Sequence, residues 1–152
     1  MWLGGGWGVD ALFGEQTRPH SDLDIVIEQR HVDALCAFLR AAGYADVPRD
    51  DTSAWNFVLG DGQGREVDFH VIVLDAAGNG IYGPPERGVM FSAESLRGEG
   101  RVGGRHVRCI AAEDQVRSHT GYPLRERDYK DVAALCERFG IAYPDEYRRP
   151  VV

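Results

Sequence analysis

The sequence predicts an α/β (α+β) fold in which helices flank a mixed β-sheet. Short runs rich in β-branched residues predict strands, and apolar residues at helical spacing predict helices between them. Glycines directly after two of the helical runs are typical helix stops. The order is strand, helix, strand, helix, several strands and two helices, which is typical of a mixed sheet.

The first part of the chain is expected to alternate strands and helices. Val9, Leu12 and Phe13 recur at helical spacing, and Gly14 is suited to end that helix. A second helical stripe ends at Gly43 in the same way. The expected elements are a strand at 1–3, a helix from the glycine run to 13, a strand at 22–28 and a helix at 31–42.

The rest of the chain predicts further strands and a C-terminal helical part. A glycine-rich loop joins two strand candidates, and this spacing indicates a hairpin. Residues 75–88 contain Gly, Pro and Asn without a periodic pattern, so we expect them to be irregular. The expected elements are strands at 55–59, 66–74 and 105–110, the last preceded by part of 96–102, and two helices within about 112–140.

Length and composition limit the class of protein. The 152 residues, 43% of them hydrophobic, fit a single domain over 1–152. The chain shows no 18-residue apolar span and no basic signal sequence, so we expect a cytoplasmic protein without a membrane partner. A net charge of −7 argues against a nucleic-acid partner. Three cysteines without a C-x-x-C pattern indicate neither a disulfide framework nor a zinc site.

Three aspartates predict a metal site. Asp22 and Asp24 begin an apolar strand and, being two residues apart, project from the same face. Asp68 interrupts another apolar strand, where a buried carboxylate is costly unless it binds a metal or a partner. Carboxylate oxygens suit Mg²⁺, so one or two Mg²⁺ ions are expected if the two strands are neighbours. The alternative is that the D-x-D pair is a chance occurrence at a strand end.

The glycine run Gly4–Gly6 precedes the first predicted helix. Gly5 and Gly6 would leave backbone N–H groups open at a positive helix N-terminus, which suits phosphates. Together with the aspartates, this turn predicts a site for a metal-bound nucleoside triphosphate. The alternative is a flexible turn. Residue pattern alone also favours His70 as a hydrogen-bonded core histidine over a metal ligand.

Several segments occur in a characteristic order along the chain. They are Trp2–Leu12, Gln16–Ile25, Val67–His70 and His119–Tyr122, followed by Asp128 and Asp131. In this order they resemble the lincosamide and aminoglycoside 2''-nucleotidyltransferases of the DNA polymerase β-like superfamily. The resemblance spans nearly the whole chain and implies a nucleotidyltransferase fold with two C-terminal helices.

The resemblance assigns roles to the acidic residues and the glycines. Asp22 and Asp24 match the family's metal-binding pair, which also contacts the nucleotide. Gly5 and Gly6 match the turn at the nucleotide phosphates. Asp68 matches the third acidic position, which completes the metal site or deprotonates the acceptor hydroxyl as the catalytic base.

Further residues are expected around the substrates. Arg18 lies on the loop before the metal strand, where it would meet phosphate oxygens, with a solvated arginine as the alternative. His70, Tyr122 and Asp131 are candidates for substrate binding. Asp128 or Asp131 would instead cap the last helix.

The function implied is Mg²⁺-dependent transfer of AMP from ATP, or of a nucleotide from another triphosphate, onto a hydroxyl of a small antibiotic, with release of pyrophosphate. The acidic composition favours an aminoglycoside acceptor, whereas the compact length favours a lincosamide. Two alternatives are a minimal nucleotidyltransferase antitoxin that modifies a partner protein and a non-catalytic nucleotide-binding module. The presence of all three carboxylates weakens the second alternative.

Two departures from the family concern the N-terminus. Relatives commonly carry an acidic residue at the position of Gly4, and a helix ahead of the first strand. We therefore expect the strand at 1–3 to be short and exposed on one side, through truncation or because a partner subunit covers it. A homodimer is the corresponding expectation.

Overall fold

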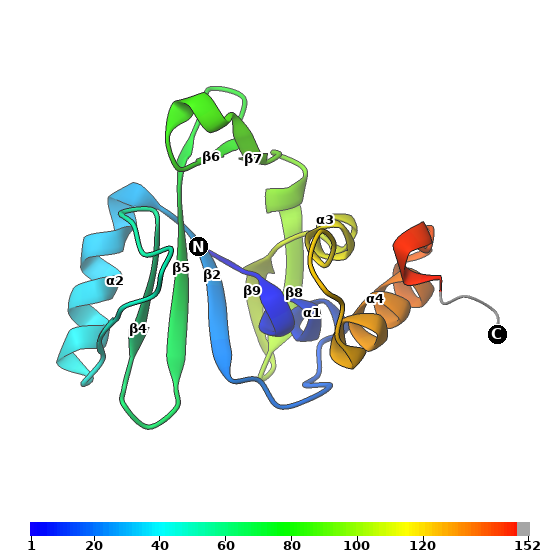
Figure 1. The fold of residues 1–152 in the computed structure, drawn as a ribbon, viewed down its shortest axis with the longest axis horizontal. Coiled ribbons are helices and arrows are strands. Elements are labelled where there is room, and N and C mark those ends of the chain that lie inside the picture. The colour runs from blue at the N-terminus through cyan, green and yellow to red at the C-terminus, as the bar shows by residue number, and fades with distance from the viewer. Residues whose placement is uncertain (149–152) are drawn as a thin grey trace.

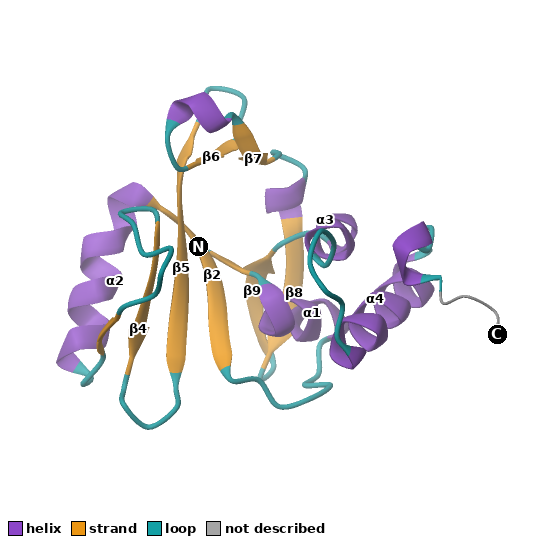
Figure 2. Cartoon of the chain, in the orientation of Figure 1, coloured by secondary structure: helices purple, strands orange, loops and turns teal. Residues whose placement is uncertain are grey.

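The computed structural model describes residues 1–148 as a mixed sheet with helices on both faces (Figure 1, Figure 2). The strands are β1 (Trp2–Leu3), β2 (Asp22–Glu28), β3 (Ala45–Val47), β4 (Asn56–Gly60), β5 (Glu66–Leu74), β6 (Gly80–Tyr82), β7 (Val89–Phe91), β8 (Gly98–Val102) and β9 (Arg105–Cys109). The helices are α1 (Gly5–Phe13), α2 (Gln29–Ala41), α3 (Ala112–Ser118) and α4 (Glu126–Phe139), with short 3-10 turns at Pro85–Arg87, Ser95–Arg97 and Asp145–Tyr147.

The strand order is β3-β4-β5-β2-β1-β9-β8, and the small β6–β7 hairpin continues from β5. The centre of the sheet is the parallel pair β2–β5, which the chain order predicted as separate strands. In this pair Asp24 lies opposite Asp68, and Val26 lies opposite His70. Because alternate residues share a face of a strand, the carboxylates of both strands project on the same side of the sheet. The predicted α+β class is confirmed.

The other face of β2 and β5 is apolar. Ile25, Ile27 and Phe69 are almost fully buried there, and they pack against residues of α2, including Leu35 and Leu39. Burying the apolar face under α2 leaves the opposite, polar face of the same strands free for a site. This division explains why apolar residues alternate with Asp22, Asp24 and Asp68 in the sequence.

The helices α1, α3 and α4 form a second layer on the polar side of the sheet (Figure 1). Val9, Val132, Leu135 and Tyr147 make its buried centre. The two C-terminal helices are where the sequence predicted them. None of the helices in residues 1–148 is both long and apolar enough to cross a membrane.

The first strand differs from the expectation. β1 is short, as predicted, but it is not exposed on one side, because it lies between β2 and β9. Trp2 is 4% exposed, and its Nε1 donates a hydrogen bond to the Leu96 carbonyl at 2.7 Å. A strand from late in the chain thus covers the surface that we expected a partner subunit to cover.

Residues 75–88 are not irregular throughout. They contain β6, which pairs with the end of β5 through Ile72 and Tyr82, and β7 follows directly. Strands of three residues are too short to show a period in the sequence, and their pairing depends on the edge offered by β5. The edge strand β3 was not predicted for the same reason.

Candidate functional site

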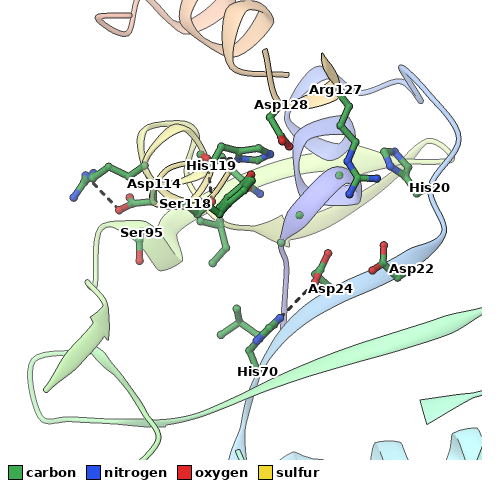
Figure 3. A pocket seen from close by; sticks show the side chains of 18 of the residues that line it. His20, Asp22, Asp24, His70, Ser95, Asp114, Ser118, His119, Arg127 and Asp128 are labelled. Atoms are coloured by element: carbon green, nitrogen blue, oxygen red, sulfur yellow. Dashed lines mark hydrogen bonds and ion pairs between the residues drawn. The ribbon is translucent and has the colours of Figure 1, made fainter. Parts of the chain in front are cut away.

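A cleft of about 1020 Å³ opens above the polar face of β2 and β5 (Figure 3). The N-terminal turn of α1 and the helices α3 and α4 form its other sides. Carboxylates from β2 face it on one side, and arginines from the loop before β2 and from the C-terminal helices line it elsewhere. The charged residues that line it are Arg18, His20, Asp22, Asp24, His70, Asp114, Arg117, His119, Arg125, Arg127 and Asp128.

Asp24, Asp68 and His70 form a compact group beside this cleft. Each offers one ligand atom, and these atoms lie within 4.8 Å of one another. His70 Nε2 is 3.5 Å from Asp24 Oδ1 and 3.9 Å from Asp68 Oδ1. The parallel register of β2 and β5 produces this convergence, so Asp24 of β2 shares one site with Asp68 and His70 of β5. Two carboxylates and an imidazole at this spacing suit a divalent cation.

Asp68 carries the clearest sign of an unfilled interaction. Its Oδ1 is buried and has no hydrogen-bond partner among the described residues. Burial raises the pKa of Asp68 to about 6, and the charges of Asp24 and Asp22 add to this effect while His70 opposes it. A cation at Asp68 would compensate the cost of the buried carboxylate. The residues present therefore fit a Mg²⁺ ion.

His70 lies at the cleft rather than in the core. Burial alone would lower its pKa, but the hydrogen bond to Asp24 and the negative charges of Asp68, Asp24 and Asp51 together outweigh burial and raise it. Its Nδ1 is 3.4 Å from the Tyr82 hydroxyl, on the β6–β7 hairpin. The side chain is 27% exposed, so His70 is accessible to a ligand as well as to the two carboxylates.

Asp22 stands outside this group of three. It projects from β2 on the same side as Asp24 (Figure 3) and is exposed. Its Oδ1 accepts a hydrogen bond from the Ser21 hydroxyl at 3.3 Å. The structure thus brings Asp24 and Asp68 together and leaves Asp22 farther along the cleft.

The glycine turn is shaped by its packing against polar side chains. Gly5 has a φ of +52°, and a Cβ there would overlap the carboxylate of Asp24. A Cβ on Gly6 would overlap the imidazole of His20 and lie 3.0 Å from Arg18 Nη2. At Gly4 a Cβ would make only ordinary contacts, the nearest at 3.7 Å to Asp24. The backbone of the turn can therefore pack this closely against Asp24, His20 and Arg18 only with glycine at positions 5 and 6, whereas position 4 does not require it.

Some of the remaining predicted residues line the cleft, and others have structural contacts instead. Arg18 and Tyr122 line the cleft, and Tyr122 is 38% exposed. Asp131 does not line it, because it is buried against Arg18, with Arg18 Nη2 at 2.8 Å from its Oδ2. Asp128, and not Asp131, caps α4: its Oδ2 accepts the backbone N–H of Arg125 at 2.7 Å.

Comparisons with known proteins identify the family. The sequence pattern of the aminoglycoside-2''-adenylyltransferase family matches residues 1–135. The chain belongs to this family. A lincosamide resistance protein of Staphylococcus haemolyticus is 33% identical over 134 residues, which cover 88% of this chain and 82% of that protein. The resemblance found in the sequence is confirmed, and the protein is a nucleotidyltransferase.

Solved structures agree with this assignment. The crystal structure of the lincosamide antibiotic adenylyltransferase LnuA, lincomycin-bound, is 32% identical and has a TM-score of 0.74, covering 93% of this chain and 86% of that one. ANT(2'')-Ia in complex with adenylyl-2''-tobramycin is 23% identical with a TM-score of 0.65, covering 91% of this chain and 79% of that one. The second comparison supports the fold alone.

The cleft also contains residues that the sequence did not reveal. Arg127, on the first turn of α4, points toward the glycine turn (Figure 3) and makes no hydrogen bond or ion pair within residues 1–148. Met90 and Phe91 of β7 line another part of the cleft. No local pattern distinguishes these residues, because only the packing of α4 and of the β6–β7 hairpin brings them to β2.

Proposed function

We propose that this adenylyltransferase moves AMP from ATP onto a hydroxyl of a lincosamide antibiotic and releases pyrophosphate. The observation that carries the proposal is the buried carboxylate oxygen of Asp68, which has no hydrogen-bond partner among the described residues and lies with Asp24 and His70 beside a cleft. A buried carboxylate in this state is suited both to a cation and to a proton. The similarity to lincosamide-modifying relatives supports the choice of reaction.

The metal of the proposed reaction is Mg²⁺. Asp24 and Asp68 would hold it, with Asp22 on the same face of the sheet as a further carboxylate. When bound, Mg²⁺ neutralises negative charge on the triphosphate. His70 is the second choice of ligand, because metal binding requires its neutral form and its raised pKa opposes this.

The triphosphate is proposed to lie between the carboxylates and the arginines. The N-terminal turn of α1 at Gly5 and Gly6 offers backbone N–H groups and the positive end of the helix. Arg18 and Arg127 supply guanidinium groups at the same cleft. Arg127 in particular makes no hydrogen bond or ion pair within residues 1–148, so its guanidinium is available to an anion.

Asp68 is proposed as the base for the acceptor hydroxyl. The pKa of about 6 is that of the carboxyl without a metal, and a Mg²⁺ ion held by Asp68 would lower it, so Asp68 would be an ionised carboxylate that can accept the hydroxyl proton. The hydroxyl oxygen forms a bond to the α-phosphorus while the bond from that phosphorus to the bridging oxygen of the β-phosphate breaks. The proton passes to Asp68, and pyrophosphate leaves.

The acceptor is proposed to occupy the apolar part of the cleft. Val26, Met90, Phe91 and Ile110 line this part. A moderately apolar antibiotic fits these side chains better than a polycation does, because several arginines line the same cleft. His70 and Tyr122 are the polar contacts that we propose for the acceptor.

The test is a product analysis with purified protein. ATP and Mg²⁺ are incubated with a panel of lincosamides and aminoglycosides, and mass spectrometry follows the antibiotic while a coupled assay follows pyrophosphate. We expect a lincosamide that carries one adenylyl group and an equal amount of pyrophosphate. An adenylylated aminoglycoside would redirect the acceptor assignment, and the absence of any product together with the absence of ATP binding would refute the proposal.

A further inference from the structure

A chain of polar side chains from α1, the loop before β2 and α4 holds Arg18 at the cleft. Asp131 of α4 contacts the guanidinium with both carboxylate oxygens, at 3.4 Å from Nε and 2.8 Å from Nη2. Asp131 is 5% exposed, whereas the Arg18 side chain is 27% exposed. A two-point contact from a buried carboxylate fixes the plane of a guanidinium, which a single contact does not.

His20 fixes the other side of Arg18. Arg18 Nη1 donates to His20 Nδ1 at 2.9 Å, and because a guanidinium can only donate, Nδ1 is the acceptor. The proton of the neutral imidazole is then on Nε2, which donates to Asp10 Oδ2. Asp10 is 2% exposed, and its other oxygen accepts the backbone N–H and the hydroxyl of Thr17 at 3.1 and 2.6 Å.

The contacts of Arg18 can be assigned one by one. Nε–H and one Nη2–H donate to Asp131, and the Nη1 hydrogens donate to His20 and to the Pro19 carbonyl at 3.3 Å. One Nη2–H remains without an acceptor in residues 1–148. Nη2 lies against the Cα of Gly6, where a Cβ would be only 3.0 Å away. This free donor is therefore next to the first turn of α1, where the triphosphate is proposed to bind.

Resting on the function proposed above, we infer that Asp131 is a positioning residue, which acts on ATP binding through Arg18 and does not contact the antibiotic. His20 and Asp10 complete the positioning, since they orient the guanidinium from its other side. Asp131 is buried, and both of its carboxylate oxygens are engaged by Arg18, with His119 Nε2 at 3.9 Å from one of them. It does not line the main cleft; it lines a smaller cavity of about 370 Å³ between α1 and α4.

A double-mutant cycle tests this inference. The variants are Asp131→Asn, Arg18→Gln and the combination of both. Asp46→Asn is the matched control, because it disrupts an Arg–Asp pair of the same two-point type, Arg40–Asp46 at 3.0 and 3.1 Å, on the exposed α2–β3 side. For each variant, calorimetry gives the Kd of ATP in the presence of Mg²⁺, steady-state kinetics give the KM of the acceptor, and a thermal melt gives the Tm.

We expect Asp131→Asn to raise the Kd of ATP about tenfold, the size of one charge-assisted hydrogen bond. The KM of the acceptor should stay within about twofold, and the combined variant should bind ATP no more weakly than Arg18→Gln alone, because coupled residues are not additive. Asp46→Asn should bind ATP as the unmodified protein does.

Two results would overturn the inference. One is evidence that Asp131 acts independently of Arg18. Such evidence would be a loss of ATP affinity in the combined variant equal to the product of the two single losses, or a higher acceptor KM when Asp131→Asn is added to Arg18→Gln. The other is a lowered Tm for Asp131→Asn with unchanged ATP affinity, which would mean a purely structural anchor. If the protein binds ATP with the expected pattern but modifies no antibiotic, the proposed acceptor fails while the role of Asp131 stands.

Discussion

Replacing Asp68 by Asn is expected to stabilise the protein in the absence of metal while abolishing its activity. The rise of the Asp68 pKa from an ordinary 3.8 to about 6 means that the ionised carboxylate opposes folding. That rise corresponds to about 3 kcal/mol at most, and solvent screening at a side chain that is 29% exposed lowers the expected gain to about 1–2 kcal/mol. For a chain of this length the Tm should rise by about 3–6 °C.

The pH dependence of this effect has a definite sign. Below the ordinary pKa of 3.8, Asp68 is protonated in both the folded and the unfolded state. The original protein and the Asp68→Asn variant should therefore be equally stable there. Between 3.8 and about 6 the unfolded chain ionises first, and the original protein loses stability relative to the Asn variant as the pH rises. Above about 6 the difference should be constant.

The assay is thermal unfolding at pH 7.5 with a chelator or with Mg²⁺. Mg²⁺ should raise the Tm of the original protein and should have a much smaller effect on Asp68→Asn, since a ligand that binds only the folded state stabilises it. Asp33→Asn removes an exposed carboxylate of α2 and serves as the control with no expected change. A lower Tm for Asp68→Asn without metal, together with equal stabilisation of both proteins by Mg²⁺, would refute the assignment of Asp68 to the metal site.

Three further changes give separate tests. Gly5→Ala should reduce kcat/KM at least tenfold, because its φ of +52° costs an alanine about 1–2 kcal/mol and its Cβ would displace the Asp24 carboxylate; unchanged kinetics would contradict the packing described for the turn. Arg127→Gln should raise the KM of ATP about tenfold whereas Arg138→Gln, on the same helix, should not; equal effects would argue for general electrostatics. Asp128→Asn should lower the free energy of unfolding by about 1 kcal/mol in urea melts at pH 7. Burial alone would raise the pKa of Asp128, but the hydrogen bonds that it accepts from the Arg125 backbone N–H and the Tyr122 hydroxyl, together with the charge of Arg125, outweigh burial and lower that pKa. The loss of stability should therefore shrink as the pH falls through the lowered pKa; a constant difference down to acidic pH would contradict it.

The sequence revealed the carboxylates of the site because they violate local patterns. Asp68 interrupts a strand whose other residues are typical of a buried core. A charge there is costly to bury unless it binds a partner, so its presence indicates a site. Asp24 and Asp68 could be assigned to one site on the expectation that their two strands are neighbours in one sheet. The parallel register that sets them opposite each other could not be derived, since it depends on how α2, β3 and β4 connect the two strands.

The arginine side of the cleft could not be predicted in the same way. Arg127 sits on the solvent-facing first turn of a helix, where arginine is common, and only the packing of α4 brings it to the glycine turn. Asp131 looked like a substrate ligand from its place in the motif, but the structure buries it against Arg18. Long-range contacts of this kind have no local signal.

The position of the first strand shows the same limit. Trp2 and Leu3 were expected to form a short strand that is exposed on one side. Strand β9 pairs with Leu3 through Cys109, which is more distant in the sequence than any local pattern can reach. An exposed first strand therefore no longer supports the expected homodimer, which stays a prediction that a sedimentation experiment can test.

The most direct test of the proposed reaction follows the fate of labelled phosphate in a single turnover. Protein, Mg²⁺ and lincomycin are mixed with ATP labelled either at the α- or at the γ-phosphate, and the products are separated. We predict that the α-label appears on the antibiotic and the γ-label in pyrophosphate, and that Asp24→Asn forms neither product. Release of the γ-label as free phosphate, or an α-label that never reaches the antibiotic, would contradict nucleotidyl transfer at this cleft.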